Sequence, residues 1–186
     1  MQTKKEIRQQ VLQQRRDMEP ETVDSLSQII CNRIKEMDEY KNATDVCLYM
    51  PVNNEVDLTF IFEDAWNTGK RTWLPKTIGH RMEFRKFTPD TPLSESAFKT
   101  LEPESDIVLE PGETTLIMMP GVAFSPDGDR LGYGSGFYDK YLEQWQKCTT
   151  VAACYDFQIV PEVPTEEHDI KPDFIISEKQ YWKKSE

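Results

Sequence analysis

The sequence predicts one α/β domain in which a largely parallel β-sheet is covered by helices on both faces. Short apolar runs typical of buried strands recur from residue 46 onward, and segments with helical periodicity separate several of them. The 186 residues, 38% of them hydrophobic, suffice for one substantial core and give no reason to propose a second. We therefore expect a single domain over residues 1–186, with ligands bound beyond the carboxyl ends of its strands.

Two amphipathic helices are predicted before the first strand. Over residues 3–18, apolar side chains recur on one side of a 3.6-residue period, and Pro20 lies just beyond this segment. A clearer apolar stripe runs over residues 22–38. We expect the two helices to pack together. The opposite side of the first one carries basic residues: Lys4, Lys5, Arg8, Arg15 and Arg16.

The remaining chain is predicted to alternate between strands and helices. The strand candidates are residues 46–50, 71–75, 82–87, 114–119, 151–155 and 174–177. Asp57 can cap a helix over residues 58–68, and Gly69 can end it. The continuous apolar run at 114–119 favours a central strand, whereas the alternation at 82–87 favours a half-exposed one. Residues 88–112 are rich in proline, serine and acidic residues, and we expect a long excursion from the same domain.

Composition excludes several classes of partner. The net charge of −11 opposes broad binding to nucleic acids or anionic membranes, so any phosphate site must be local. The four cysteines form no CxxC pair, so we expect reduced, mostly buried thiols. No apolar run reaches membrane-spanning length, and the first residues lack the apolar stretch of a secretory signal. A cytoplasmic location is therefore expected.

The stretch RLGYGSGFYDKYL, residues 130–142, contains three of the chain's eight glycines. It connects a strand candidate to a predicted helix that begins near Gly136, and such a connection can turn backbone N–H groups toward an anion. Arg130 adds a full positive charge, and Asp139 could hold Mg²⁺ beside bound phosphates. Two other interpretations stay open from the residues alone: the glycines can simply permit a tight connection, and Asp139 can simply favour a helix N-terminus.

A longer segment, LIMMPGVAFSPDGDRLGYGSGFYDKYL at residues 116–142, resembles the signature of the 5-formyltetrahydrofolate cyclo-ligase family. Further matches are KKEIR at 4–8, YMPVNNEVD at 49–57, WLPK at 73–76 and VPTEEHDIKPDFII at 163–176. Ser135 and Phe137 depart from the residues we expect at those loop positions. The resemblance implies a three-layer α/β/α Rossmann-like fold similar to that of phosphosugar isomerases and coenzyme A transferases.

The resemblance also implies a reaction. Such enzymes use ATP and Mg²⁺ to close the formyl group of 5-formyltetrahydrofolate onto N10, through a phosphorylated formyl oxygen. The products are 5,10-methenyltetrahydrofolate, ADP and phosphate. Phosphoryl transfer needs positioning and charge compensation more than a protein nucleophile, which suits a site made of basic residues, backbone amides and a metal. Arg130 and Tyr138 are the catalytic candidates.

The binding residues that the resemblance implies come from distant parts of the chain. The ATP contacts are Lys4, Lys5, Glu6, Ile7, Arg8, Arg130, Leu131, Gly132, Tyr133, Gly134, Ser135, Gly136, Phe137 and Tyr138. The substrate contacts are Met50, Glu55, Lys76, Tyr133, Gly134, Ser135, Gly136 and Phe137. Asp139 and Asp169 are the expected magnesium ligands, and we expect a structural role for His168.

Two other classes of function remain possible at this point. One is a nucleotide or folate binding module without turnover. The other is an isomerase or transferase acting on phosphosugars or coenzyme A thioesters, an idea that depends on fold analogy alone. In the leading hypothesis the partner is a small folate, with or without a polyglutamate tail. We expect a monomer that binds neither nucleic acid nor membrane.

Overall fold

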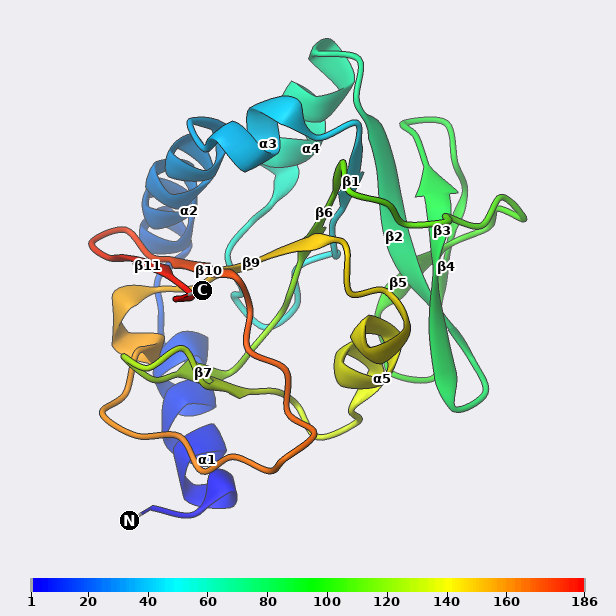
Figure 1. Ribbon diagram of the computed structural model, residues 1–186. Helices are drawn as coiled ribbons and strands as arrows, with labels where there is room; N and C mark the ends of the chain where they lie inside the picture. Colours follow the sequence, from blue (N-terminus) through cyan, green and yellow to red (C-terminus); the bar gives the residue numbers. More distant parts are fainter. Residues whose placement is uncertain (1, 186) are drawn as a thin grey trace.

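The computed structural model describes residues 2–185 and contains a seven-stranded central sheet (Figure 1). Its strand order is β11-β10-β9-β6-β1-β2-β3. The strands are β1 (Asp45–Cys47), β2 (Arg71–Ile78), β3 (Arg81–Phe87), β6 (Thr115–Met118), β9 (Thr149–Ala153), β10 (Phe174–Ile176) and β11 (Tyr181–Lys183). The five inner strands run parallel, and the edge strands β3 and β11 are antiparallel to their neighbours. The predicted α/β fold with a largely parallel sheet is confirmed.

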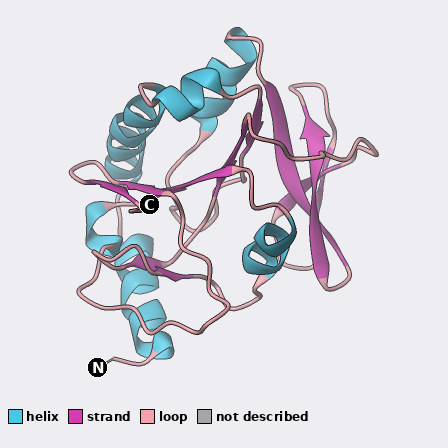
Figure 2. Ribbon diagram, viewed as in Figure 1, coloured by secondary structure: helices cyan, strands magenta, loops and turns pink. Residues whose placement is uncertain are grey.

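Helices cover both faces of this sheet (Figure 2). They are α1 (Lys4–Arg16), α2 (Pro20–Lys35), α3 (Asp38–Asn42), α4 (Thr59–Asn67), α5 (Phe137–Gln144) and the short 3₁₀ helix η1 (Asp156–Gln158). Strand β6 shows how the two faces are built, because Leu116 and Met118 pack in the core beneath α2 and α4, whereas Ile117 packs in the core beneath α5. Alternate side chains of a strand point to opposite faces, so a fully apolar strand can serve two cores.

The helix boundaries follow local chemistry. A capping box starts α1, because the Thr3 side chain accepts from the Glu6 N–H while the Glu6 carboxylate accepts from the Thr3 N–H. Pro20 is the first residue of α2, where its missing N–H costs nothing, so this helix begins two residues earlier than predicted. Gly69, with φ of +75°, follows the end of α4 as predicted.

The excursion at residues 88–112 is an ordered part of the domain. It contains a hairpin of β4 (Leu93–Glu95) and β5 (Leu101–Pro103), and β5 packs against β2. A second short hairpin, β7 (Ala123–Phe124) with β8 (Arg130–Leu131), precedes the glycine loop. Neither hairpin nor β11 was predicted. Strands of two or three residues carry little periodicity, and β10, which is equally short, was predicted only because all three of its residues are apolar.

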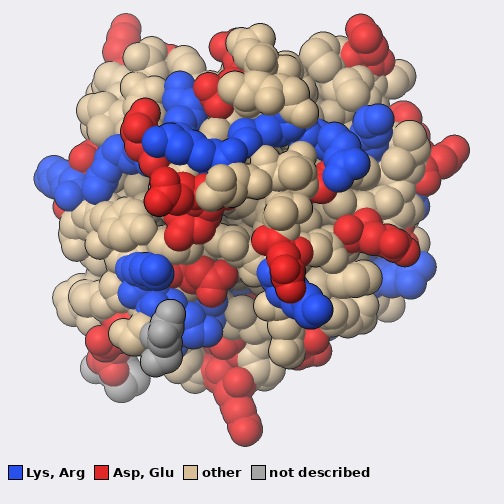
Figure 3. All heavy atoms as spheres, turned by 45° about the horizontal axis from the view of Figure 1, so that its top comes forward, with Lys and Arg blue, Asp and Glu red and all other residues tan. Residues whose placement is uncertain are grey.

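Other properties of the chain agree with its composition. Cys31, Cys47, Cys148 and Cys154 are all buried free thiols, and burial raises the pKa of Cys148 to about 11. On the face drawn in Figure 3, basic side chains form a narrow band flanked by acidic ones. Within residues 2–185, no helix has both the length and the apolar character that a membrane crossing needs.

Candidate functional site

A cavity of about 840 Å³ lies beyond the carboxyl ends of β1 and β6. Its walls are α1, the loop after β1, strand β2, the β4–β5 hairpin and the glycine loop at 130–136. This is the edge of a parallel sheet where ligands are expected. The volume lies in the upper part of the range found for ligand pockets, so the cavity has room for more than a small metabolite.

The glycine loop needs glycine for two different physical reasons. Gly134 and Gly136 have φ of +107° and +68°, backbone conformations that other residues rarely adopt, and Gly136 directly precedes α5. Gly132 allows a close approach instead, because a Cβ atom at this position would lie 2.9 Å from Nη1 of Arg130. At its three glycines the loop therefore presents backbone to the cavity.

Arg130 is buried at the wall of the cavity, with 9% of its surface exposed. Its Nη1 donates to the Pro120 carbonyl at 3.0 Å, and its Nη2 donates to Oδ1 of Asp139 at 2.9 Å. Its Nε–H has no hydrogen-bond partner among residues 2–185. An unsatisfied buried donor costs about 1–3 kcal/mol. A ligand with an acceptor atom at this position would remove that cost.

Helix α1 supplies two more cations to the cavity. Lys4 and Arg8 are four residues apart and so share one side of the helix. The Lys4 Nζ lies 2.8 Å from Oε1 of Glu166 and 3.4 Å from Oδ2 of Asp169, and the hydrogen bond to Glu166 raises the pKa of Lys4. Arg8 donates from Nε to the carbonyl of Gly132 at 2.8 Å. These contacts attach α1 to both sides of the cavity mouth.

The three residues between Lys4 and Arg8 were also predicted to contact ATP, but they do not line the cavity. Ile7 is buried in a core cluster with Val122 and Leu131, Glu6 caps the start of α1, and Lys5 is exposed. A helix turns by about 100° per residue, so the residues between positions 4 and 8 must face other directions. The structure brings only Lys4 and Arg8 from this stretch to the cavity.

The other side of the cavity contains a buried carboxylate, Glu55, which is 7% exposed. Its Oε2 accepts from the Val52 N–H at 2.9 Å, and its Oε1 accepts from the hydroxyl of Tyr133. The buried Arg15 in turn donates to that hydroxyl at 2.7 Å and to the Asn53 carbonyl at 2.8 Å. Burial raises the pKa of Glu55, while Tyr133 and Arg15 oppose this rise. Both oxygens of Glu55 are thus engaged by the protein.

Apolar side chains form the wall near Glu55. Met50 lines the cavity together with Pro75 and Met82, and Phe98 of the hairpin contacts Phe137 edge-on at a centroid distance of 5.6 Å. Such a wall suits a flat heterocycle better than a triphosphate.

Lys76, a predicted substrate contact, is not part of the cavity lining. Its Nζ donates to the Pro103 carbonyl at 3.2 Å and pairs with Glu104 at 3.4 Å. Alternation along β2 explains this, because the flanking residues Pro75 and Thr77 face the cavity and the residue between them faces away.

Asp139 and Asp169, 30 residues apart, both line the cavity. Oδ1 of Asp139 accepts from the N–H of Ile170 at 3.0 Å, which brings the two aspartates into neighbouring positions. Residues 2–185 contain no cluster of three or more acidic, His or Cys side chains able to hold a metal ion. Mg²⁺ commonly binds through one or two carboxylates together with substrate phosphates and water, and the two aspartates fit that pattern. His168 is exposed and lies 3.4 Å from Glu166.

Several lining residues were missed from the sequence. Thr77 and Glu102 are the clearest polar ones, and the buried Arg15 acts on the site through Tyr133. Arg15 carried only a weak signal, because it lies among other basic residues on α1. Glu102 gave none, since an acid in an acidic, proline-rich segment is ordinarily exposed.

Comparisons with known proteins agree on one family. A model described as the 5-formyltetrahydrofolate cyclo-ligase family matches residues 1–178. The chain is 31% identical to the 5-formyltetrahydrofolate cyclo-ligase of Escherichia coli K12, covering 92% of this chain and 98% of that one. It is 28% identical to the mouse enzyme of the same name, covering 94% and 93%.

Solved structures give the same result. The 5,10-methenyltetrahydrofolate synthetase of Aquifex aeolicus superposes with a TM-score of 0.86 at 33% identity, covering 97% of this chain and 92% of that one. The synthetase of Mycoplasma pneumoniae gives a TM-score of 0.79 at 26% identity, covering 96% and 100%.

Proposed function

Because this chain belongs to the 5-formyltetrahydrofolate cyclo-ligase family, we propose that its cavity binds ATP beside α1 and the glycine loop and binds 5-formyltetrahydrofolate against the opposite wall. The chain is a 5-formyltetrahydrofolate cyclo-ligase, and its family implies the use of ATP. The observation that supports the proposed arrangement is one continuous cavity with a cationic side, containing Lys4, Arg8 and Arg130, and an apolar side with Met50 and Met82.

The proposed chemistry starts at the formyl oxygen, which is a poor leaving group. This oxygen attacks the γ-phosphorus of ATP, a new P–O bond forms, and the bond to the ADP oxygen breaks. N10 then attacks the activated formyl carbon, loses its proton, and the C–O bond breaks to release phosphate. The product is the 5,10-methenyl ring. In each step negative charge develops on the phosphate oxygen of the leaving group, ADP in the first and inorganic phosphate in the second, so cations held beside the phosphates lower both barriers.

Individual residues are assigned to this chemistry by position. Arg130 would compensate the phosphate charge from the wall of the cavity, where it is buried and held by Pro120 and Asp139. Lys4 and Arg8 would bind the outer phosphates. Tyr138 is the second catalytic candidate: it lines the cavity and its buried hydroxyl is without a partner among residues 2–185. Burial raises the pKa of Tyr138, so its hydroxyl stays neutral and can donate.

The remaining loop residues fit the border between the two ligands. Leu131, Gly132, Tyr133, Gly134, Ser135, Gly136 and Phe137 all line the cavity between its cationic and apolar sides. We assign Asp139 and Asp169 to Mg²⁺, which would supply positive charge to the phosphates. Met50 would contact the folate ring, and Glu55 would orient the loop beside it through Tyr133.

We also propose that the protein works as a monomer, because the residues assigned to both ligands come from a single chain. The proposed location is the cytoplasm. We propose that the substrate can carry a polyglutamate tail, which would extend out of the cavity through its open side. No role is assigned to nucleic acid or membrane.

One assay tests the proposed function. Purified protein is mixed with 5-formyltetrahydrofolate, ATP and Mg²⁺, and the methenyl product is followed by its near-ultraviolet absorbance while released phosphate is measured in parallel. We expect equal amounts of product and phosphate. Stoichiometric binding of both ligands without phosphate release would instead support a binding module.

A further inference from the structure

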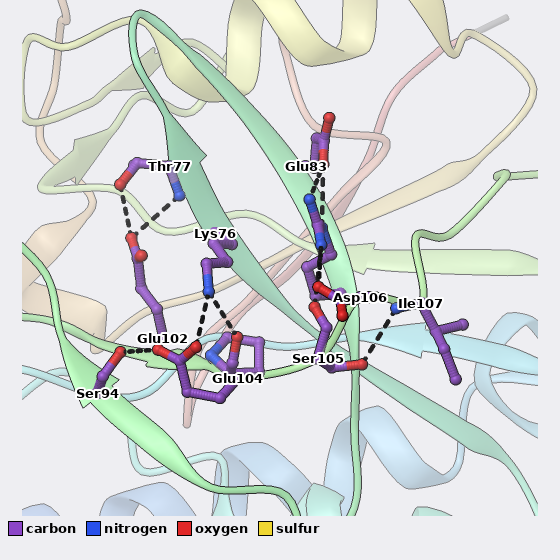
Figure 4. A network of polar contacts seen from close by, with 11 residues as sticks. Lys76, Thr77, Glu83, Ser94, Glu102, Glu104, Ser105, Asp106 and Ile107 are labelled. Atoms are coloured by element: carbon purple, nitrogen blue, oxygen red, sulfur yellow. Dashed lines mark hydrogen bonds and ion pairs between the residues drawn. The ribbon is translucent and has the colours of Figure 1, made fainter.

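Glu102 is a buried carboxylate that none of the roles above uses. It lies in β5, is 8% exposed, and lines the cavity. Its Oε1 accepts two hydrogen bonds from Thr77 of β2, one from the backbone N–H at 3.0 Å and one from the hydroxyl at 2.7 Å (Figure 4). These two bonds hold Oε1 of Glu102 against β2.

The second oxygen of Glu102 is free. Its Oε2 accepts no hydrogen bond from any group within residues 2–185, and no lysine or arginine in that range forms an ion pair with the carboxylate. Figure 4 shows that the nearby Lys76 is directed to Glu104 instead. A buried carboxylate without a charge partner is unfavourable unless its oxygens accept hydrogen bonds. The free oxygen is not one of the fully buried polar atoms without a partner, so it is open to the cavity, where a ligand can bring a donor.

Glu55 and Glu102 differ in this respect. Both oxygens of Glu55 already accept hydrogen bonds from the protein, through Val52 and Tyr133. Of these two buried carboxylates, only Glu102 has an oxygen that accepts no hydrogen bond from residues 2–185. Glu102 also lies near apolar residues of the cavity. Leu101, the residue before it, and Pro75, on the same strand as its partner Thr77, both line the cavity. The expected ligand group is thus a flat ring with hydrogen-bond donors on one edge.

We propose that Glu102 is a specificity residue that accepts hydrogen bonds from the donor edge of the reduced pterin, where the 2-amino group and the N3–H lie side by side. This inference rests on the proposed function, since the pterin is part of the folate substrate. A carboxylate oxygen has two lone pairs, so the free Oε2 can accept from both adjacent N–H donors, and charge-assisted bonds of this kind are about twice as strong as neutral ones. Thr77 holds the carboxylate so that its free oxygen faces the ring.

The test compares two ligands in two proteins. Dissociation constants are measured by calorimetry, without ATP, for 5-formyltetrahydrofolate and for its analogue lacking the 2-amino group. We expect the wild-type protein to prefer the natural ligand by at least about tenfold, and Glu102→Ala to bind both within about twofold, because the discriminating acceptor is gone. Thr77→Val, which keeps only the backbone bond, should give an intermediate preference.

The control is Glu104→Gln, two residues along the same hairpin, whose partners are Lys76 and Ser94 outside the cavity lining. It should keep the wild-type preference. Circular dichroism checks that each variant folds. If Glu102→Ala does not fold, Glu102→Gln serves in its place, because its amide oxygen can still accept from Thr77 while its NH₂ group opposes the pterin donors.

The outcomes separate this inference from the proposed function. An undiminished preference for the 2-amino ligand in the folded Glu102 variant overturns the role of Glu102, even if wild-type turnover is normal. An absence of methenyl product from the wild-type protein overturns the proposed reaction, even if the ligand preference depends on Glu102 as expected.

Discussion

The two sides of the cavity hold their charged groups in opposite ways. On the α1 side, Lys4 pairs with Glu166, whose side chain is 56% exposed, and this acid can move away when a phosphate arrives. On the proposed folate side, Glu55 and Glu102 are almost completely buried and accept hydrogen bonds from backbone N–H groups and hydroxyls. On the first side the ion-pair partner can be exchanged for a ligand, whereas on the second side the charged groups are held in place before the ligand binds.

This difference matches the ligand that we propose for each side. A triphosphate is flexible and strongly charged, so mobile cations can follow it, and exposed ion pairs contribute too little stability to resist exchange. A pterin is rigid and presents a defined donor edge, so a fixed acceptor costs least to reorganise on binding. Arg130 is the exception on the cationic side, because it is buried and held by Asp139.

The largest expected effect therefore comes from Arg130→Ala. Removal of a fixed, buried cation from the phosphate side should lower kcat on the order of a hundredfold, with the fold retained. Steady-state kinetics and a melting curve check this. The control is Arg16→Ala, an exposed arginine in the last turn of α1, which should leave both unchanged. A wild-type kcat in Arg130→Ala would remove this residue from the mechanism.

The next largest effect is expected for Arg15→Met, which tests the side of the cavity that contains the buried Glu55. The free energy of unfolding should fall by about 3 kcal/mol at neutral pH, since Glu55 and Tyr133 lose a buried positive partner. The pKa of folded Glu55 lies above its ordinary value of 4.5, so this group favours folding below pH 4.5 and its contribution is lost as pH rises through the raised pKa. Without Arg15 that pKa rises further, so the loss should extend to higher pH.

Urea denaturation between pH 4 and 8 measures this pH dependence. The matched control is Arg15→Met in a Glu55→Gln background, where no carboxylate titrates at this position. An equal pH slope in both backgrounds would show that the Arg15 charge does not act on Glu55.

A smaller effect is expected for the aspartates. Asp139→Asn and Asp169→Asn should each raise the Mg²⁺ concentration needed for half-maximal rate on the order of tenfold, because an amide is a weaker magnesium ligand than a carboxylate. Magnesium titrations at saturating ATP give the value. Asp127→Asn, at a loop position outside the cavity lining, is the control. Unchanged titrations in both variants would reject the pairing.

The smallest effect is expected for Glu166→Gln on the α1 side. Lys4 would lose an exposed partner, so the KM for ATP should fall by no more than about twofold and the melting temperature should not change. Raising the salt concentration should remove the difference between variant and wild type. A large loss of stability would show that this ion pair is structural.

Part of the site was predictable because it depends on local geometry. The four-residue spacing of Lys4 and Arg8 already places them on one side of α1, and the glycines of residues 130–136 already indicate a backbone-lined loop. The predicted contacts at Lys5, Glu6, Ile7 and Lys76 followed a continuous motif instead. Helical rotation and strand alternation turn these side chains away from the cavity.

The sequence by itself determined the direction of each side chain relative to its own element, and hence the layers of the fold and the cationic side of α1. Only the tertiary structure decided which elements meet: Asp139 beside Ile170, Arg15 against Tyr133, and Glu102 against Thr77. Periodicity is a property of a few neighbouring residues, whereas contacts between distant residues depend on how loops close and cores pack. The polar groups of this cavity depend on contacts between distant residues. They could therefore be recognised only once the positions of the sheet and the two hairpins were known.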